Sequence, residues 1–142
     1  KYINKDSLRV VTDTGWYLID TATGDFAQLS QYPRASLLHY DASAGRMALV
    51  FAGSRRGQNT LSLVDTATGK AVSAEVSGAV LDVACYDSYA AVLTDRALLC
   101  YSNAGELISE SAVESGEQGV LAADGQYVVL TGKRHARYVK IS

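Results

Sequence analysis

The feature that most constrains the fold of this chain is a five-residue segment that occurs twice without change. Residues 20–24 and residues 65–69 both read Asp-Thr-Ala-Thr-Gly, and each copy follows a short apolar run and precedes a more polar one. A degenerate third copy, Tyr-Ser-Asn-Ala-Gly, occupies residues 101–105. The closing glycines are spaced 45 and then 36 residues apart, close to the period of a four-stranded propeller blade. The repeat therefore predicts an all-β, propeller-type fold with blades of four antiparallel strands.

The other apolar runs can be assigned to blades around these three turns. We expect one partial propeller domain over residues 1–142, with blade units at about 7–30, 36–76, 79–111 and 119–141. The units carry three, four, four and three strands, or about three and a half blades. The run 106–114 also fits a helical stripe, but its place after the third turn predicts a strand. Residues 115–119 are predicted to form a flexible junction.

An arc of this size does not close a ring by itself. Propellers close with four to eight blades, so the terminal units would expose apolar faces. Further blades in a longer parent chain or a second copy of this chain would cover those faces. Because the sequence starts at Lys1 without a methionine, we expect a longer parent chain, and self-association of the isolated segment.

Composition excludes several classes of protein. With 48% hydrophobic and 20% charged residues, the chain is globular, and its net charge of −2 gives no field that would select nucleic acid. No apolar run approaches the roughly 20 residues of a membrane-spanning helix, so we expect no membrane segment in this chain. Cys85 and Cys100 fall on the first and third strands of one unit, which is too far apart for a disulfide. We expect two buried free thiols.

The repeated turns offer a structural and a functional interpretation. In the structural one, the aspartate accepts hydrogen bonds from backbone amides two or three residues on, and the glycine adopts a left-handed conformation. In the functional one, the turn contributes oxygen ligands to Ca²⁺, but each turn offers a single carboxylate. The structural interpretation is therefore preferred for Asp20, Gly24, Asp65, Gly69 and Gly105. Gly15, before the run 16–20, is also expected to have a positive φ.

Cationic residues gather in the connections expected at one end of the blades. Loops between the second and third strands lie on the same face of a propeller as the loops between blades. The candidate ligand-binding rim on this face comprises Arg34, Arg55, Arg56, Arg96, Lys133, Arg134, His135 and Arg137. It would receive an anionic group or an acidic patch of a partner protein. Solvated loops that preserve solubility are the alternative, and Asp13 and Asp95 on the same face dilute the charge.

Motifs of catalysis and cofactor binding are not found in the sequence. There is no nucleophile elbow, phosphate-binding glycine loop, paired carboxylate motif or metal-ligand cluster, so we expect no catalytic residues, no cofactor and no metal. His39 lies on a predicted strand near the propeller axis. With one other histidine in the chain, it is interpreted as a hydrogen-bonded interior residue.

Two short segments resemble known propeller repeats. Residues 63–70, Leu-Val-Asp-Thr-Ala-Thr-Gly-Lys, resemble the repeat of bacterial YVTN-type and pyrroloquinoline-quinone-like propellers, and residues 124–129, Asp-Gly-Gln-Tyr-Val-Val, resemble the first hairpin of such blades. The overall pattern of strands and turns in the sequence also resembles a domain-of-unknown-function family of membrane-anchored propellers from Gram-positive anaerobes. Quinone-like blades carry a docking tryptophan where this chain has Gln28, Ser73 and Ser109, which counts against a quinone enzyme.

The resemblance implies a bacterial, extracytoplasmic binding protein, on the cell surface or in the periplasm. The predicted function is a non-enzymatic binding or scaffold module that recognises a protein or a cell-envelope ligand through one loop face. The alternative is a segment of a propeller enzyme, a hydrolase or lyase, whose catalytic residues lie outside this chain.

Overall fold

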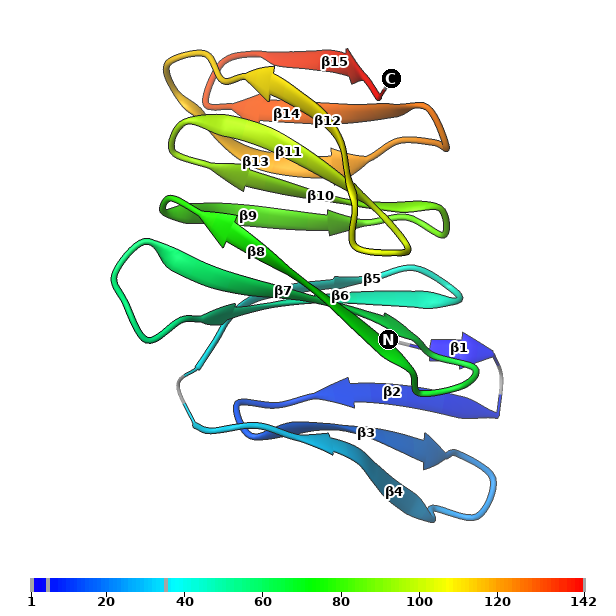
Figure 1. Cartoon of the computed structure of the whole chain (residues 1–142). Helices are drawn as coiled ribbons and strands as arrows, with labels where there is room; N and C mark the ends of the chain where they lie inside the picture. The colour runs from blue at the N-terminus through cyan, green and yellow to red at the C-terminus, as the bar shows by residue number, and fades with distance from the viewer. Residues whose placement is uncertain (1, 5, 35, 142) are drawn as a thin grey trace. The chain divides into compact units, whose positions relative to one another are not determined.

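The computed structural model describes residues 2–4, 6–34 and 36–141, and the chain divides into two compact units, residues 1–37 and 38–142. The described residues form fifteen strands in four antiparallel sheets (Figure 1). This confirms the predicted all-β fold of antiparallel blades. The described part of the chain holds no helix with the length and apolar character needed to span a bilayer.

Each sheet is a meander whose strands pair in chain order. The first unit is one sheet of four strands, β1 (Tyr2–Asn4), β2 (Ser7–Val11), β3 (Gly15–Asp20) and β4 (Phe26–Gln31). The second unit begins with the sheet β5 (Leu37–Ala42), β6 (Arg46–Ala52), β7 (Gln58–Asp65) and β8 (Ala71–Ser77). Its next sheet contains β9 (Val80–Cys85), β10 (Tyr89–Thr94), β11 (Ala97–Ser102) and β12 (Leu107–Ala112). Its last sheet has three strands, β13 (Glu117–Ala122), β14 (Tyr127–Gly132) and β15 (Ala136–Lys140).

Two elements differ from the sequence prediction. The first unit gains β1, which pairs with β2 through Tyr2 opposite Leu8. The flexible junction predicted over residues 115–119 is wrong from Glu117 onward, because Glu117 pairs with Gly132 and starts β13. The predicted strand after the third turn is confirmed as β12, so the repeat outweighed the local helix-like pattern.

The three sheets of the second unit lie face to face, and their buried side chains form two clusters (Figure 1). We call the face that a sheet turns to the next sheet in the chain its trailing face, and the opposite face its leading face. The trailing face of β5–β8, with Val50 and Leu61, packs on the leading face of β9–β12, with Val83 and Val92. The trailing face of β9–β12 packs in the same way on the leading face of β13–β15.

Side-chain oxygens on the first strands hold neighbouring sheets together. Asp41 on β5 accepts a hydrogen bond from the backbone N–H of Cys85 on β9 at 2.8 Å. Asp82 on β9 accepts one from the backbone N–H of Val120 on β13 at 2.9 Å. These bonds satisfy backbone donors at the junctions between sheets, where an unpaired N–H would be costly. They repeat from one junction to the next, and no local sequence pattern predicted them.

Two tyrosines of β9–β12 add one bond to each neighbouring sheet. The hydroxyl of Tyr89 donates to the backbone oxygen of Tyr127 at 2.9 Å, and the hydroxyl of Tyr101 donates to the backbone oxygen of Glu75 at 3.2 Å. Burial raises the pKa of both phenols, which keeps them protonated as donors. The tyrosines thus bridge sheets in a chain that lacks docking tryptophans at the expected positions.

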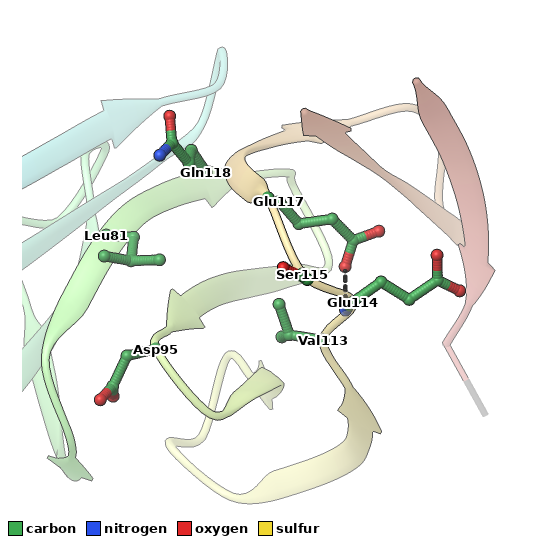
Figure 2. Close-up of a pocket in the computed structure, with 8 residues that line it drawn as sticks. Leu81, Asp95, Val113, Glu114, Ser115, Glu117 and Gln118 are labelled. Carbon is green, nitrogen blue, oxygen red and sulfur yellow. Dashed lines mark hydrogen bonds between the residues drawn. The ribbon is translucent and has the colours of Figure 1, made fainter. Parts of the chain in front are cut away.

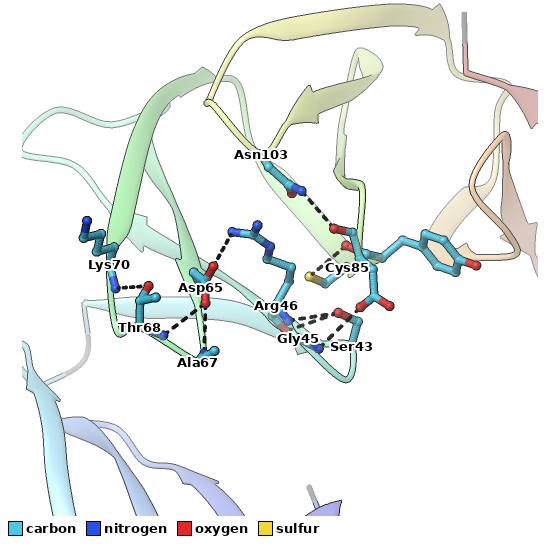
Figure 3. Close-up of polar contacts among 11 residues, drawn as sticks. Ser43, Gly45, Arg46, Asp65, Ala67, Thr68, Lys70, Cys85 and Asn103 are labelled. Atoms are coloured by element: carbon cyan, nitrogen blue, oxygen red, sulfur yellow. Dashed lines mark hydrogen bonds and ion pairs between the residues drawn. The ribbon is translucent and has the colours of Figure 1, made fainter.

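The repeated turns have the predicted geometry (Figure 3). Asp65 Oδ1 accepts hydrogen bonds from the backbone N–H groups of Thr68 and Ala67 at 3.1 and 2.9 Å, and Asp20 makes the same pair of bonds in its own turn. These bonds stabilise the carboxylate and lower the pKa of Asp65. Gly24 and Gly69 have φ values of 78° and 72°, as predicted. The turns are therefore explained by local hydrogen bonding and backbone geometry.

The third turn and Gly15 show variations on this chemistry. Tyr101 stands at the position of the aspartate, and the next residue, Ser102, accepts a hydrogen bond through its Oγ from the backbone N–H of Ala104 at 3.2 Å, while Gly105 has a φ of 80°. The positive φ predicted for Gly15 is wrong. A Cβ atom at that position would lie 2.4 Å from the backbone oxygen of Ser30, so the close approach of β4 requires the glycine.

Cys85 and Cys100 are free and buried, as predicted. Burial raises the pKa of the Cys85 thiol and raises that of Cys100 to about 11. Since the thiolate is the reactive form, both groups are poor nucleophiles in the folded protein.

The turn geometry predicts that Gly69→Val destabilises the fold by about 1–2 kcal/mol, because a β-branched residue is disfavoured in the left-handed region. A Cβ atom added at this position meets nothing within 4 Å, so the expected cost is conformational. Urea unfolding gives the free energies. Gly45→Val is the matched control, because Gly45 lies in a turn without a positive φ and its Cβ would meet only Asp87, at 4.0 Å. Equal losses in the two variants would contradict this account.

The burial of the thiols predicts slow modification of the native protein and rapid modification of the unfolded one. Ellman's reagent at pH 8 should count two thiols per chain in denaturant without reductant, and far fewer in the same time without denaturant. Cys100→Ala should reduce the count in denaturant to one. A count near zero for the wild type would show a disulfide and refute the strand assignment.

Candidate binding face

Five connections of the second unit lie at the same end of its three sheets and form what we call the loop face. This follows from the meander, in which every second connection returns to the same end. The connections are residues 53–57, 78–79, 95–96, 113–116 and 133–135. Hydrogen bonds join neighbouring connections. The N–H of Gly78 donates to Gly57 O at 2.8 Å. The N–H of Asp95 donates to Ala79 O at 2.9 Å, and the N–H of Ala79 donates back to Asp95 Oδ1 at 3.0 Å.

Most of the predicted rim lies exposed on this face. The exposed members carried by the β6–β7, β10–β11 and β14–β15 connections are Arg55, Arg56, Arg96, Lys133, Arg134 and His135. The structure thus brings the cations of three successive sheets to one end of the second unit.

Arg34 belongs to the first unit and pairs there with Asp13, with its Nε 3.0 Å from Asp13 Oδ2. Both side chains are largely exposed, so the pair adds little stability. His39 lies half-buried on β5.

Arg137 differs from the other predicted rim residues because its charge is already paired inside the sheet. Its Nε and Nη2 donate to the two carboxylate oxygens of Glu117 at 2.6 and 3.0 Å. Nη2 also donates to the backbone oxygen of Ala112 at 2.8 Å, which joins β15 to the end of β12. The Glu117 side chain is fully buried, and the bonds from Arg137 lower the pKa of its carboxyl.

Glu117 also shapes the connection that leads into its own strand. Its Oε2 accepts a hydrogen bond from the backbone N–H of Glu114 at 2.8 Å, and its own N–H donates to Glu114 O at 3.2 Å. Residues 113–116 are therefore held in a fixed turn between β12 and β13. The sequence analysis missed this group, since nothing in the local pattern links Glu117 to Arg137.

The fixed turn forms one wall of a hollow on the loop face (Figure 2). The hollow has a volume of about 490 Å³. Leu81 and Val113 provide apolar surface, while Asp95 and Glu114 provide carboxylates. The remaining lining residues are Ser115, Gly116, Glu117 and Gln118. The hollow is thus lined by both apolar and acidic side chains.

Glu114, Glu117 and His135 bring possible metal-ligand atoms within 4.8 Å of one another. The sequence predicted no metal cluster. In the structure the guanidinium of Arg137 contacts both carboxylate oxygens of Glu117, and its Nε lies 3.6 Å from Glu114. A metal ion would have to displace this cation, so the group is better described as an ion-paired cluster.

Comparisons with known proteins identify the architecture. No family model and no curated protein sequence matches the chain. Among solved structures, the computationally designed Ika4 protein matches 98% of this chain and 88% of its own, with a TM-score of 0.70 and 16% identity. The computationally designed Ika8 protein matches 97% of this chain and 44% of its own, with a TM-score of 0.72 and 16% identity.

A protein-complex structure shows the same fold. A chain of the nidogen/laminin complex matches 96% of this chain and 56% of its own, with a TM-score of 0.65 and 7% identity. At these identities the similarity shows the fold alone, and that fold is a β-propeller. The chain spans about half the length of the Ika8 and nidogen/laminin chains that it matches.

The buried Glu117–Arg137 pair predicts a stability change with a defined pH dependence. Glu117→Gln should cost about 1.5–3 kcal/mol at neutral pH, because it removes a charge-assisted pair of hydrogen bonds. Since folding lowers the pKa of Glu117, its contribution is present above the ordinary glutamate pKa of about 4.3 and is lost as the pH falls through the folded value. Urea unfolding from pH 7 to pH 3 should show the two proteins converging. Glu114→Gln, at a more exposed site, is the control. If the free energies of unfolding of the wild type and of Glu117→Gln differed by the same amount at every pH, the stabilising role of the Glu117 carboxylate would be contradicted.

Proposed function

We propose that this chain is a non-enzymatic binding module that recognises an acidic surface patch of a partner protein through the loop face of its second unit. The observation that carries the proposal is that the exposed cations of three connections lie at the same end of the sheets as a preformed hollow. Arg55 and Arg56 stand on one connection, Arg96 on the next, and Lys133 and Arg134 on the third.

The rigidity of the face supports binding. Backbone hydrogen bonds join the connections 53–57, 78–79 and 95–96, and the β12–β13 turn is fixed by Glu117. A face that is ordered before binding loses less conformational entropy when a partner docks. The hollow gives this face a shape that solvated surface loops alone would lack.

The charge pattern favours a protein over a uniform polyanion. Asp95 and Glu114 line the hollow at the same end of the sheets as the cations, where they would repel a continuous chain of negative charge. A protein surface can place acidic groups against the cations and a basic or polar group over the hollow. The exposed cations would then accelerate association and set orientation, while the apolar contacts at Leu81 and Val113 would add affinity.

The fold is compatible with this role, and the sequence suggests a setting. The nidogen/laminin structure shows that a similar fold occurs in a complex of two proteins. The turn at residues 65–69 supports a relationship to YVTN-type bacterial propellers, which we retain as a proposal together with an extracytoplasmic location. The buried, protonated thiols offer no activated nucleophile, in keeping with a binding role.

Binding of two anionic probes to the intact chain tests the proposal. A polyglutamate peptide represents an acidic protein segment, and heparin represents an acidic glycan. Isothermal titration should detect peptide binding at low salt that weakens as salt increases. Arg56→Ser with Arg134→Ser should weaken binding by roughly tenfold and flatten its salt dependence.

The control variant removes the same charge from the opposite end of the sheets. Lys70→Ser with Lys140→Ser should bind the peptide like the wild type, with the mass in solution checked for each sample. No peptide binding at low salt, or an equal loss in the control, would refute the proposed face. Binding of heparin alone would replace the protein partner with a glycan.

A further inference from the structure

The last sheet of the chain leaves its trailing face exposed. Leu121, Val129 and Tyr138 are direct neighbours across β13, β14 and β15, so they form one row on that face. Leu121 is 60% exposed and Tyr138 is 73% exposed. Tyr127 extends the row, with its ring in edge contact with that of Tyr138 at 6.5 Å. This is a continuous apolar surface, which soluble proteins rarely leave uncovered.

The first sheet carries an apolar surface on its leading face. Leu8, Ile19 and Phe26 are paired across β2, β3 and β4, and the Tyr17 ring contacts Phe26 edge-on at 6.4 Å. Ser7 pairs with Asp20 in the first sheet, and Arg46 pairs with Asp65 in β5–β8, each next to a copy of the repeated turn. The cross-strand row that follows this pair is therefore at the same position of the repeat in both sheets. In β5–β8 this row contains Met47 and lies on the leading face, opposite the side chains that contact β9–β12. The row that contains Leu8 therefore lies on the leading face of the first sheet. Phe26 is 72% exposed.

We propose that the trailing face of β13–β15 in one copy of this chain packs on the leading face of β1–β4 in a second copy. Both sheet contacts inside the second unit join a trailing face to a leading face. The last sheet therefore has the surface that a blade of this repeat presents to its successor, and the first sheet has the surface that such a blade presents to its predecessor. This contact is separate from the loop face and does not depend on the proposed function.

Charge complementarity favours this pairing over a contact between two identical faces. From β2 to β4, residues 7–31, the chain has three aspartates, Asp13, Asp20 and Asp25, and one arginine, Arg9. From β13 to β15 it has four cations, Lys133, Arg134, Arg137 and Lys140, and two carboxylates. The two segments thus have opposite formal charges, which favours a contact between them over a contact between two copies of either one.

The size of the assembly also fits two copies. Two chains supply eight sheets, within the range of four to eight blades in closed propellers. The matched fold fills 88% of the Ika4 chain and 44% of the Ika8 chain, so an arc of this length occurs both as nearly a whole chain and as about half of one. Two reciprocal contacts of the same kind in a pair would cover the trailing face of β13–β15 and the leading face of β1–β4 in both copies.

Light scattering on the intact chain tests the proposal. The wild type should have twice the chain mass of 15.1 kDa. Tyr138→Glu and Phe26→Lys should each give monomers, because each places a charge in both contacts of the pair. Leu107→Glu, on the outer strand β12, is a matched control at another exposed apolar residue and should remain a dimer.

A mixture of the two monomeric variants is the decisive experiment. A mixed pair has one wild-type contact and one contact in which glutamate faces lysine, so equimolar Tyr138→Glu and Phe26→Lys should recover the dimer mass. A wild-type monomer at high concentration, or assemblies larger than two copies, would overturn the proposal. So would a Phe26→Lys protein that remains dimeric, since that result would place two trailing faces together.

Discussion

The arrangement of the second unit depends on how the first strand of each sheet is bonded to the first strand of the next. Asp41 and Asp82 each accept a hydrogen bond from a backbone N–H of the following sheet, and Asp82 also accepts one from its neighbour Val83. An ionised acceptor makes a stronger bond than a neutral one. These bonds set the spacing of the sheets where their first strands meet, and the apolar clusters fill the space beyond them.

The loop face follows from that constraint. Once the first strands are fixed, every second connection of the meander must end at the same side, and the connections are close enough to exchange backbone hydrogen bonds. The last sheet has one strand fewer, and it is secured in another way. Arg137 bonds both to Glu117 of its own sheet and to Ala112 at the end of β12. The ion pair thus stabilises the sheet and fixes the wall of the hollow.

The parts of the fold that the sequence predicted depend on short-range patterns. The aspartate–glycine turns could be predicted because the side chain bonds to amides two and three residues away. β1 has only three residues and no visible alternation, and Gly15 is required by a backbone oxygen fifteen residues away in sequence rather than by its own φ. The position of the rim cations at one end of the sheets could be predicted from the order of strands and connections alone. The pairing of Glu117 with Arg137 joins residues that no local pattern relates.

Two sets of exposed apolar residues in the described part of the chain differ physically. Leu107 and Ile108 are consecutive on the outer strand β12, so their side chains point to opposite faces and do not form a patch. Leu121, Val129 and Tyr138 instead lie side by side across three strands, at positions that pack against a neighbouring sheet elsewhere in the repeat. An isolated exposed apolar side chain needs no explanation, whereas a row with the register of a sheet contact does. The repeat therefore identifies which exposed surface is a missing contact, and the charges of the terminal sheets identify what would complete it.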